Sequence, residues 1–294
     1  MDTTTALQLC RFLHDASLML LWGACAYLSL LVPRILADTA WRMVARPFLL
    51  IAAIAVFTVL AALPVATANI GSGWSDALDV GMIHDVVFET TIGVAWQAQA
   101  LAAIVIVCAL LLPESWRRHG LALGAGLGLA SLSLTGHASM LEGWVQQAHR
   151  ANDVLHVLAG GGWLGALVPL LTILRLLGRP ECRAEAQLAL RRFSNAGHVA
   201  VALVILSGIV NTLLILKHLP TDWSSPYQML LAIKIALVAV MAVLAIVNRY
   251  VFVPWIGRKP VRALLALRLG SITEIIIGIV VIGLVAAFGM LEPV

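Results

Sequence analysis

The sequence is poor in charged residues. Only 12% of them are Asp, Glu, Lys or Arg, about half of the roughly 25% that is usual in a soluble globular chain. Hydrophobic residues make up 61%, and apolar runs of about 20 residues recur along the chain. A soluble domain is therefore excluded. The runs lack the polar–apolar alternation of barrel strands, so the chain is predicted to cross a membrane as helices.

Several common sequence motifs are also missing. The opening segment MDTTTALQLC has no basic residue and no small-residue cleavage site, so the first apolar run is predicted to be a retained helix and not a signal peptide. The four cysteines form no CxxC pair, and they are interpreted as unpaired structural thiols. There is no HExxH motif and no short His-x-His motif. No enzymatic activity is predicted.

The apolar runs predict eight spans in a single transmembrane domain, 1–294. Their approximate limits are 6–32, 48–68, 90–112, 120–136, 152–176, 193–216, 227–252 and 263–290. The fourth span is short, and its glycines at 120, 124 and 128 predict close packing against neighbouring helices. The predicted fold class is an all-α polytopic membrane helical bundle.

Basic residues predict the orientation of the bundle. Fifteen of the 19 Lys and Arg residues fall on one side of the predicted spans, which the positive-inside rule makes cytoplasmic. Most acidic residues fall on the other side. An even number of spans then places both termini in the periplasm of a bacterial inner membrane. The pI of about 9.1 reflects this topology, and nucleic acid is not a predicted partner.

Six of the eight histidines lie at or near the predicted outer side. The stretch 136–163 is the densest: His137 ends the fourth span, His149 precedes the fifth, and His156 lies about one turn inside the fifth. Asn152, Asp153 and His156 share one helix face. A buried histidine about one turn inside a span is expected to face the bundle interior or a cavity.

These residues make a metal site the leading interpretation. Imidazole binds copper, zinc, iron and nickel, and thioether sulfur favours Cu(I), so His137, His156, His84 and His149 with Met140 favour copper. The alternative for each histidine is a hydrogen-bonded polar residue at the headgroup layer. For His137 and His156 the ligand interpretation is preferred, and for His84 and His149 the two are balanced.

Four further ionisable residues lie within spans. His14 and Asp15 are neighbours in the first span, where they form an ion pair, a proton relay, a metal ligand with its carboxylate, or part of an aqueous vestibule. Lys234 and Glu274 are predicted to reach similar depths in the seventh and eighth spans. An ion pair between Lys234 and Glu274 is the preferred interpretation, because an unpaired charge at that depth is costly.

Several segments resemble the bacterial copper-resistance protein D family. They are RFLHDASLMLLWGA at 11–24, GHASM at 136–140, HVLAGGGWLGAL at 156–167, RRFSNAGHVAVALVILSGIVNT at 191–212 and YQMLLAIKIALVAVMAVLAIVNRYVFVP at 227–254. The last segment, with Lys234 and the Asn248–Arg249 pair, is the most specific. The resemblance covers nearly the whole chain.

This resemblance implies an eight-span inner-membrane protein that moves copper from periplasm to cytoplasm, and the sequence leaves both Cu(I) and Cu(II) open. It implies a periplasmic copper-binding protein as donor or acceptor. The family's motif histidines correspond to His137 and His156, and more loosely to His14, His84 and His149. Asn211, Lys234, Glu274, Ser207 and Thr273 are candidates for a polar path below the outer site.

Two other functions stay open from the sequence. Histidines on different helices of one bundle also bind haem axially, so a b-type haem electron carrier is the first alternative. The second is a periplasm-facing copper-binding factor that does not transport. The lipid bilayer is a predicted partner in every case, and a homodimer is a further prediction.

Overall fold

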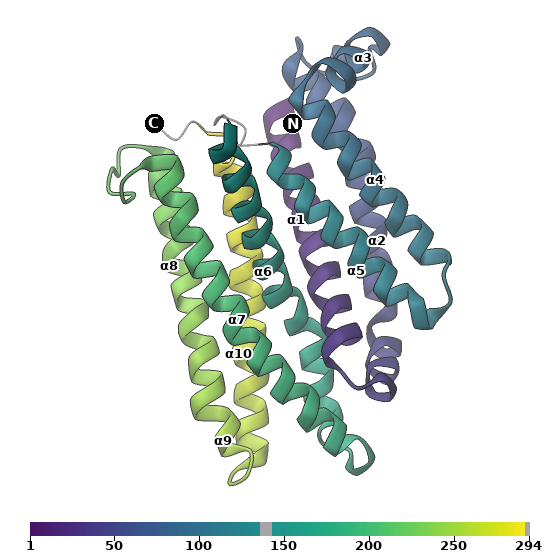
Figure 1. Cartoon of the computed structure of the whole chain (residues 1–294), viewed down its shortest axis with the longest axis vertical. Coiled ribbons are helices and arrows are strands. Elements are labelled where there is room, and N and C mark those ends of the chain that lie inside the picture. Colours follow the sequence, from purple (N-terminus) through teal and green to yellow (C-terminus); the bar gives the residue numbers. More distant parts are fainter. Residues whose placement is uncertain (136–142, 292–294) are drawn as a thin grey trace.

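The computed structural model describes residues 1–135 and 143–291, and all regular structure in these two ranges is helical. In chain order the elements are α1 (Thr3–Ala26), η1 (Tyr27–Leu31), α2 (Arg34–Ile70), η2 (Trp74–Asp76), α3 (Val80–Glu89), α4 (Thr91–Leu111), α5 (Glu114–Ser131), η3 (Leu132–Leu134), α6 (Gly143–Leu176), η5 (Pro180–Cys182), α7 (Arg183–Leu216), α8 (Pro226–Val247), η6 (Asn248–Phe252), α9 (Val253–Trp255) and α10 (Pro260–Phe288). The long helices pack side by side as one bundle (Figure 1). The predicted all-α polytopic bundle is confirmed.

Seven of the described helical segments are long and apolar enough to cross a membrane. The fourth predicted span corresponds to α5, which has 18 residues, or about 27 Å of helix, and carries Glu114, Arg117 and Arg118 in its first turns. Because of these charges, α5 is not among the seven segments that are apolar enough to cross a membrane. Figure 1 nevertheless shows α5 antiparallel to α4 and in the bundle beside α1, as an eighth crossing requires.

Helix ends differ from the predicted span ends. The span predicted at 152–176 belongs to α6, which begins nine residues earlier at Gly143 and has 34 residues, and the span predicted at 48–68 lies in the 37-residue α2. A helix of 37 residues is about 55 Å long, well beyond a hydrocarbon core of about 30 Å. Hydropathy locates the membrane, whereas these helices continue with polar residues past it.

Glycines bring α1 and α6 into backbone contact. A Cβ added at Gly23 would meet the carbonyl oxygen of Gly161, and one added at Gly165 would meet the carbonyl oxygen of Met19. Close packing of α5 is confirmed in the same way, since a Cβ at Gly124 would lie 2.7 Å from Cγ1 of Ile106 on α4. Small residues therefore set the spacing of the central helices.

The start of α1 and the end of α10 lie at the same end of the bundle (Figure 1). An even number of crossings gives this arrangement, in agreement with the predicted eight. The side of the membrane on which this end lies stays a prediction from the distribution of charge.

Candidate functional site

The strongest polar cluster joins α6 to α7 through side-chain hydrogen bonds. Nδ1 of His156 lies 2.8 Å from Oγ of Ser207. Nδ2 of Asn152 donates to the Ser207 carbonyl at 2.9 Å and to Oδ1 of Asn211 at 2.5 Å. Nδ2 of Asn211 donates to Oδ1 of Asp153 at 2.5 Å. The predicted shared face of Asn152, Asp153 and His156 is therefore confirmed, and that face packs on α7.

Ser207 is positioned by its own helix. Its side chain is buried, and Oγ donates to the Leu203 carbonyl at 2.5 Å, the bond of a helical serine to the preceding turn. Gly208 leaves room for the imidazole, because a Cβ there would lie 3.4 Å from Cε1 of His156. Asn211 follows Ser207 by four residues and so lies on the same face of α7.

Lys234 on α8 belongs to this cluster and not to Glu274. Its ammonium group is close enough to Asp153 and His156 for its charge to act on both side chains, and its Nζ lies 6.0 Å from the ring centroid of Phe288 at the end of α10. Across the described residues there is no ion pair between Lys234 and Glu274. The predicted pair of Lys234 with Glu274 is therefore wrong.

Glu274 has different partners. It is only 2% exposed, and its Oε1 accepts from Nδ2 of Asn248 at 2.8 Å, while Oε2 accepts from Nε1 of Trp163 at 3.3 Å. Phe288, which lies beside Lys234, is about 21 Å further along α10. The prediction took each span to be only as long as the hydrocarbon core, and the greater length of the real helices separates the two charges.

His149 lies inside α6 and not in a loop before it. Its side chain is 1% exposed, and Nε2 lies 3.9 Å from Oδ2 of Asp153, one turn further along the helix. Neither ring nitrogen has a hydrogen-bond partner in the described part of the chain. His149 and His156 are about 10 Å apart along a continuous helix, so one ion does not bridge them.

His14 and Asp15 turn to different surroundings. Nδ1 of His14 lies 2.9 Å from Oγ1 of Thr58 on α2, and the buried Nε2 has no partner among the described residues. Asp15 is half-buried, and Arg11 lies one turn before it on α1. No ion pair links His14 with Asp15 within the described ranges, so that interpretation of the two residues is wrong.

His84 is separate from both groups. It lies on α3, which packs on α2 and α4, and its imidazole stacks near Phe88 at 4.9 Å between ring centroids. The side chain is 65% exposed, and Nδ1 lies 3.5 Å from Oδ1 of Asp85. Figure 1 places α3 at the edge of the bundle, away from α6. His84 therefore does not join the cluster of α6 and α7.

The two remaining predicted ligands, His137 and Met140, lie outside the described residues. Within the two described ranges, no group of three or more His, Cys, Asp or Glu side chains is arranged to hold a metal ion. The described part of the chain thus offers single buried histidines with polar partners, and not a complete metal centre.

Some partners of the candidate residues were not predicted. Thr58 and Trp163 gave no signal in the sequence, because each lies in an apolar run and its partner is on another helix. Asn248 was named only as part of the segment 227–254 that resembles the copper-resistance protein D family, and not as a partner of Glu274. Ser207 and Asn211 were predicted as path residues, but not as the hydrogen-bonding partners of His156 and Asp153.

Comparison with known proteins identifies the family over most of the chain. Residues 1–147 match the family model "Copper resistance protein D-like, N-terminal domain", and residues 187–288 match "Copper resistance protein D". No solved structure matches.

Three curated relatives are similar in sequence. The chain is 33% identical over 288 residues to "Inner membrane protein YebZ" of Escherichia coli (strain K12), which covers 96% of this chain and 97% of the relative. It is 35% identical to "Copper resistance protein D" of Pseudomonas syringae pv. tomato over 76% of this chain and 74% of that one. It is 30% identical to "Copper transport protein CutJ" of Bacillus subtilis (strain 168) over 63% of this chain and 36% of that one. Together with the helical bundle, these matches show that the chain belongs to the copper resistance protein D family and is a multi-pass protein of the inner membrane.

Proposed function

We propose that this protein carries copper ions from the periplasm across the inner membrane. Membership of the copper resistance protein D family supports copper handling. One relative bears the name of a copper transport protein, which supports transport as the form of handling. Copper is then the cargo, taken up at an outer site and passed along polar groups inside the bundle.

The observation that carries the proposal is the hydrogen bond between His156 and Ser207, from which the tautomer of His156 follows. Oγ of Ser207 uses its single proton in the bond to the Leu203 carbonyl, so towards His156 it acts as an acceptor. Nδ1 of His156 therefore carries the ring proton, and Nε2 keeps its lone pair. A histidine held in this way by its other nitrogen is the usual form of a metal-binding imidazole.

The surroundings of His156 suit the passage of a cation. Asn152, Asn211 and Asp153 supply carbonyl and carboxylate oxygens next to the imidazole, between α6 and α7. The positive charge of Lys234 would oppose a copper ion, but Asp153 offsets that charge. The polar path thus runs along α6, α7 and α8.

The outer site is proposed to include His137 and Met140, which precede α6 in the sequence, followed by His149 and then His156 on α6 itself. Imidazole with a thioether sulfur is a ligand set that selects copper. His14 and His84 belong to other parts of the bundle and are not assigned to this path. A periplasmic copper-binding protein is proposed as the donor or acceptor at the outer site.

Copper accumulation in cells tests this proposal. Cells producing the wild-type chain, His156→Ala or His218→Ala at equal membrane levels are grown in copper, and their copper is measured. His218 is the matched control, because it is exposed in the loop after α7. We expect His156→Ala to lose most of the copper gained with the wild type, and His218→Ala to keep it. Equal accumulation with His156→Ala would remove His156 from the path.

The two alternatives give different results in the same material. A purified protein with a strong Soret band and stoichiometric haem would identify a haem electron carrier. A protein that binds copper while its cells accumulate no more than cells without it would be a non-transporting factor. A colourless protein with one or two bound coppers, together with accumulation, is the result expected here.

A further inference from the structure

A basic pocket lies where α1 gives way to α2 and α4 gives way to α5. Its volume is about 290 Å³, several times the ~30 Å³ that one water molecule occupies. The lining residues with polar or aromatic side chains are Ser29, Arg34, Ser115, Trp116, Arg118 and His119. The pocket belongs to the end of the bundle that carries most of the basic residues, away from the copper path proposed above.

Arg118 is the buried group of this pocket. Its side chain is 3% exposed, and Nη2 donates to Oδ1 of Asp38 at 2.6 Å. Its Nε and Nη1 have no hydrogen-bond partner in the described protein. An arginine has five N–H donors and never loses its charge, and leaving such donors unpaired in a buried position is costly. The guanidinium therefore has donors left for an additional acceptor.

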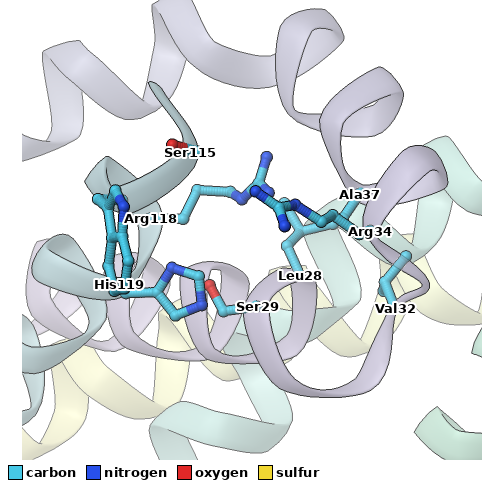
Figure 2. A pocket seen from close by; sticks show the side chains of 9 residues that line it. Leu28, Ser29, Val32, Arg34, Ala37, Ser115, Arg118 and His119 are labelled. Carbon is cyan, nitrogen blue, oxygen red and sulfur yellow. The ribbon is translucent and has the colours of Figure 1, made fainter. Parts of the chain in front are cut away.

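Arg34 converges on the same point. Figure 2 shows the guanidinium groups of Arg34 and Arg118 reaching toward one another from α2 and α5, with His119 beside them. Two like charges at close range repel unless an anion lies between them. Asp38 pairs with Arg118 and contributes one negative charge against two positive ones, so the three side chains together keep a net positive charge.

Helix ends add to this positive potential. α2 begins at Arg34 and α5 at Glu114, and each is preceded by a proline that makes no side-chain cap. Neither helix start is thus capped by a side chain, and both present the positive ends of their dipoles at this end of the bundle. Arg34 and Ala37 from the first turn of α2, and Ser115 and Arg118 from the first turns of α5, line the pocket. Helix N-termini with nearby arginines form a common type of phosphate site.

We propose that this pocket binds a phosphate group, supplied either by an anionic lipid headgroup or by free phosphate. Arg118 and Arg34 would hold its oxygens, with Ser29 as a further hydroxyl whose buried Oγ has no partner among the described residues. Trp116 at the rim is 65% exposed, as is usual for a tryptophan at headgroup level. Basic pockets between helix ends on the cytoplasmic side take lipid headgroups of this kind. The site is independent of copper transport.

Melting of the purified full-length chain in detergent tests the site. The probes are short-chain phosphatidylglycerol, short-chain phosphatidylcholine and inorganic phosphate, all at matched ionic strength. Arg34→Gln removes an exposed arginine of the pocket, and Arg42→Gln makes the same change two turns further along α2, outside it. We expect phosphatidylglycerol to raise the melting temperature, with a half-saturating concentration about tenfold higher in Arg34→Gln and unchanged in Arg42→Gln.

Comparing the responses to the lipids and to inorganic phosphate distinguishes a lipid headgroup from free phosphate. An Arg34-dependent response to phosphatidylglycerol that inorganic phosphate does not compete away identifies a lipid headgroup. An Arg34-dependent response to inorganic phosphate, with no difference between the two lipids, identifies free phosphate. Equal responses of Arg34→Gln and Arg42→Gln to every probe would overturn the proposal, and so would equal responses to the two lipids with no response to inorganic phosphate.

Discussion

Two buried histidines share one way of being held. His14 faces Thr58, whose hydroxyl donates to the Ala55 carbonyl, just as the hydroxyl facing His156 donates to a carbonyl on its own helix. In both cases the hydroxyl is left as an acceptor, so Nδ1 carries the proton and Nε2 keeps a lone pair. A helical Ser or Thr therefore fixes the tautomer of a histidine on the neighbouring helix.

Removing one such hydroxyl tests its effect on copper. Ser207→Ala takes away the acceptor of His156 Nδ1, so we expect the dissociation constant for copper to rise by roughly tenfold, as for other groups that orient a metal-binding histidine. Competition titration against a copper chelator measures it. Ser131→Ala is the control, because Ser131 is also buried and donates to a carbonyl of the preceding turn, that of Gly128. Equal effects of the two changes would show that the hydroxyl does not act through His156.

The second prediction for single residues concerns the charged neighbour of Lys234. Asp153→Asn and Lys234→Met are each expected to lower the free energy of unfolding. The loss in the double variant should be smaller than the sum of the two single losses by about 1 kcal/mol, because each charge is removed together with the one it interacts with. Thermal unfolding in detergent measures this coupling. Lys234→Met combined with Glu274→Gln is expected to be additive, since no ion pair joins the two in the described ranges and Phe288, which lies beside Lys234, is about 21 Å from Glu274 along α10. Coupling to Glu274 and not to Asp153 would restore the originally predicted pair.

At the scale of helices, contact between α1 and α6 depends on glycine. A Cβ at Gly165 would lie 2.9 Å from both the Gly23 Cα and the Leu20 carbonyl oxygen, which are backbone atoms with little freedom to move. We expect Gly165→Ala to destabilise the protein by about 1–3 kcal/mol through overpacking, and to lower the melting temperature by several degrees. Gly160→Ala on the same helix would meet only a Val204 methyl at 3.9 Å, and it should leave the melting temperature unchanged or slightly raised. The reverse order would contradict the packing described here.

The sequence predicts which segments cross the membrane better than where their helices end. Apolar runs report the hydrocarbon core directly, because a spanning backbone must bond to itself and its side chains must suit lipid. The segment from Gly143 to Ala151 is polar enough to resemble a loop, yet it continues α6, since nothing in it breaks a helix. His149 was misplaced for this reason.

The candidate site is predictable within one helix and not between helices. The spacing of Asn152 and His156 predicted their common face, because helical periodicity is local. Their partners on α7 depend on which helix packs against α6 and at what height. The error over Lys234 and Glu274 has the same origin, since depth within a span says nothing about lateral neighbours.

At the scale of the whole molecule, both ends of the chain are expected in the periplasm. The start of α1 and the end of α10 lie at one end of the bundle (Figure 1). Most basic residues of the sequence fall in the segments at the other end. Topology reporters fused before residue 2 and after residue 291 should both report the periplasm, while a reporter inserted at 178–179 should report the cytoplasm. Reporters on opposite sides would mean an odd number of crossings, and α5 would then not span.

The central claim is that copper crosses through this bundle by way of His156, and copper uptake by vesicles containing only the purified protein tests it most directly. Vesicles that enclose a copper-sensitive dye are compared for the wild type, His156→Ala and His218→Ala. The account predicts uptake faster than in protein-free vesicles for the wild type and His218→Ala, with a rate roughly tenfold lower for His156→Ala. Wild-type uptake no faster than in protein-free vesicles, or an unchanged rate with His156→Ala, would contradict it.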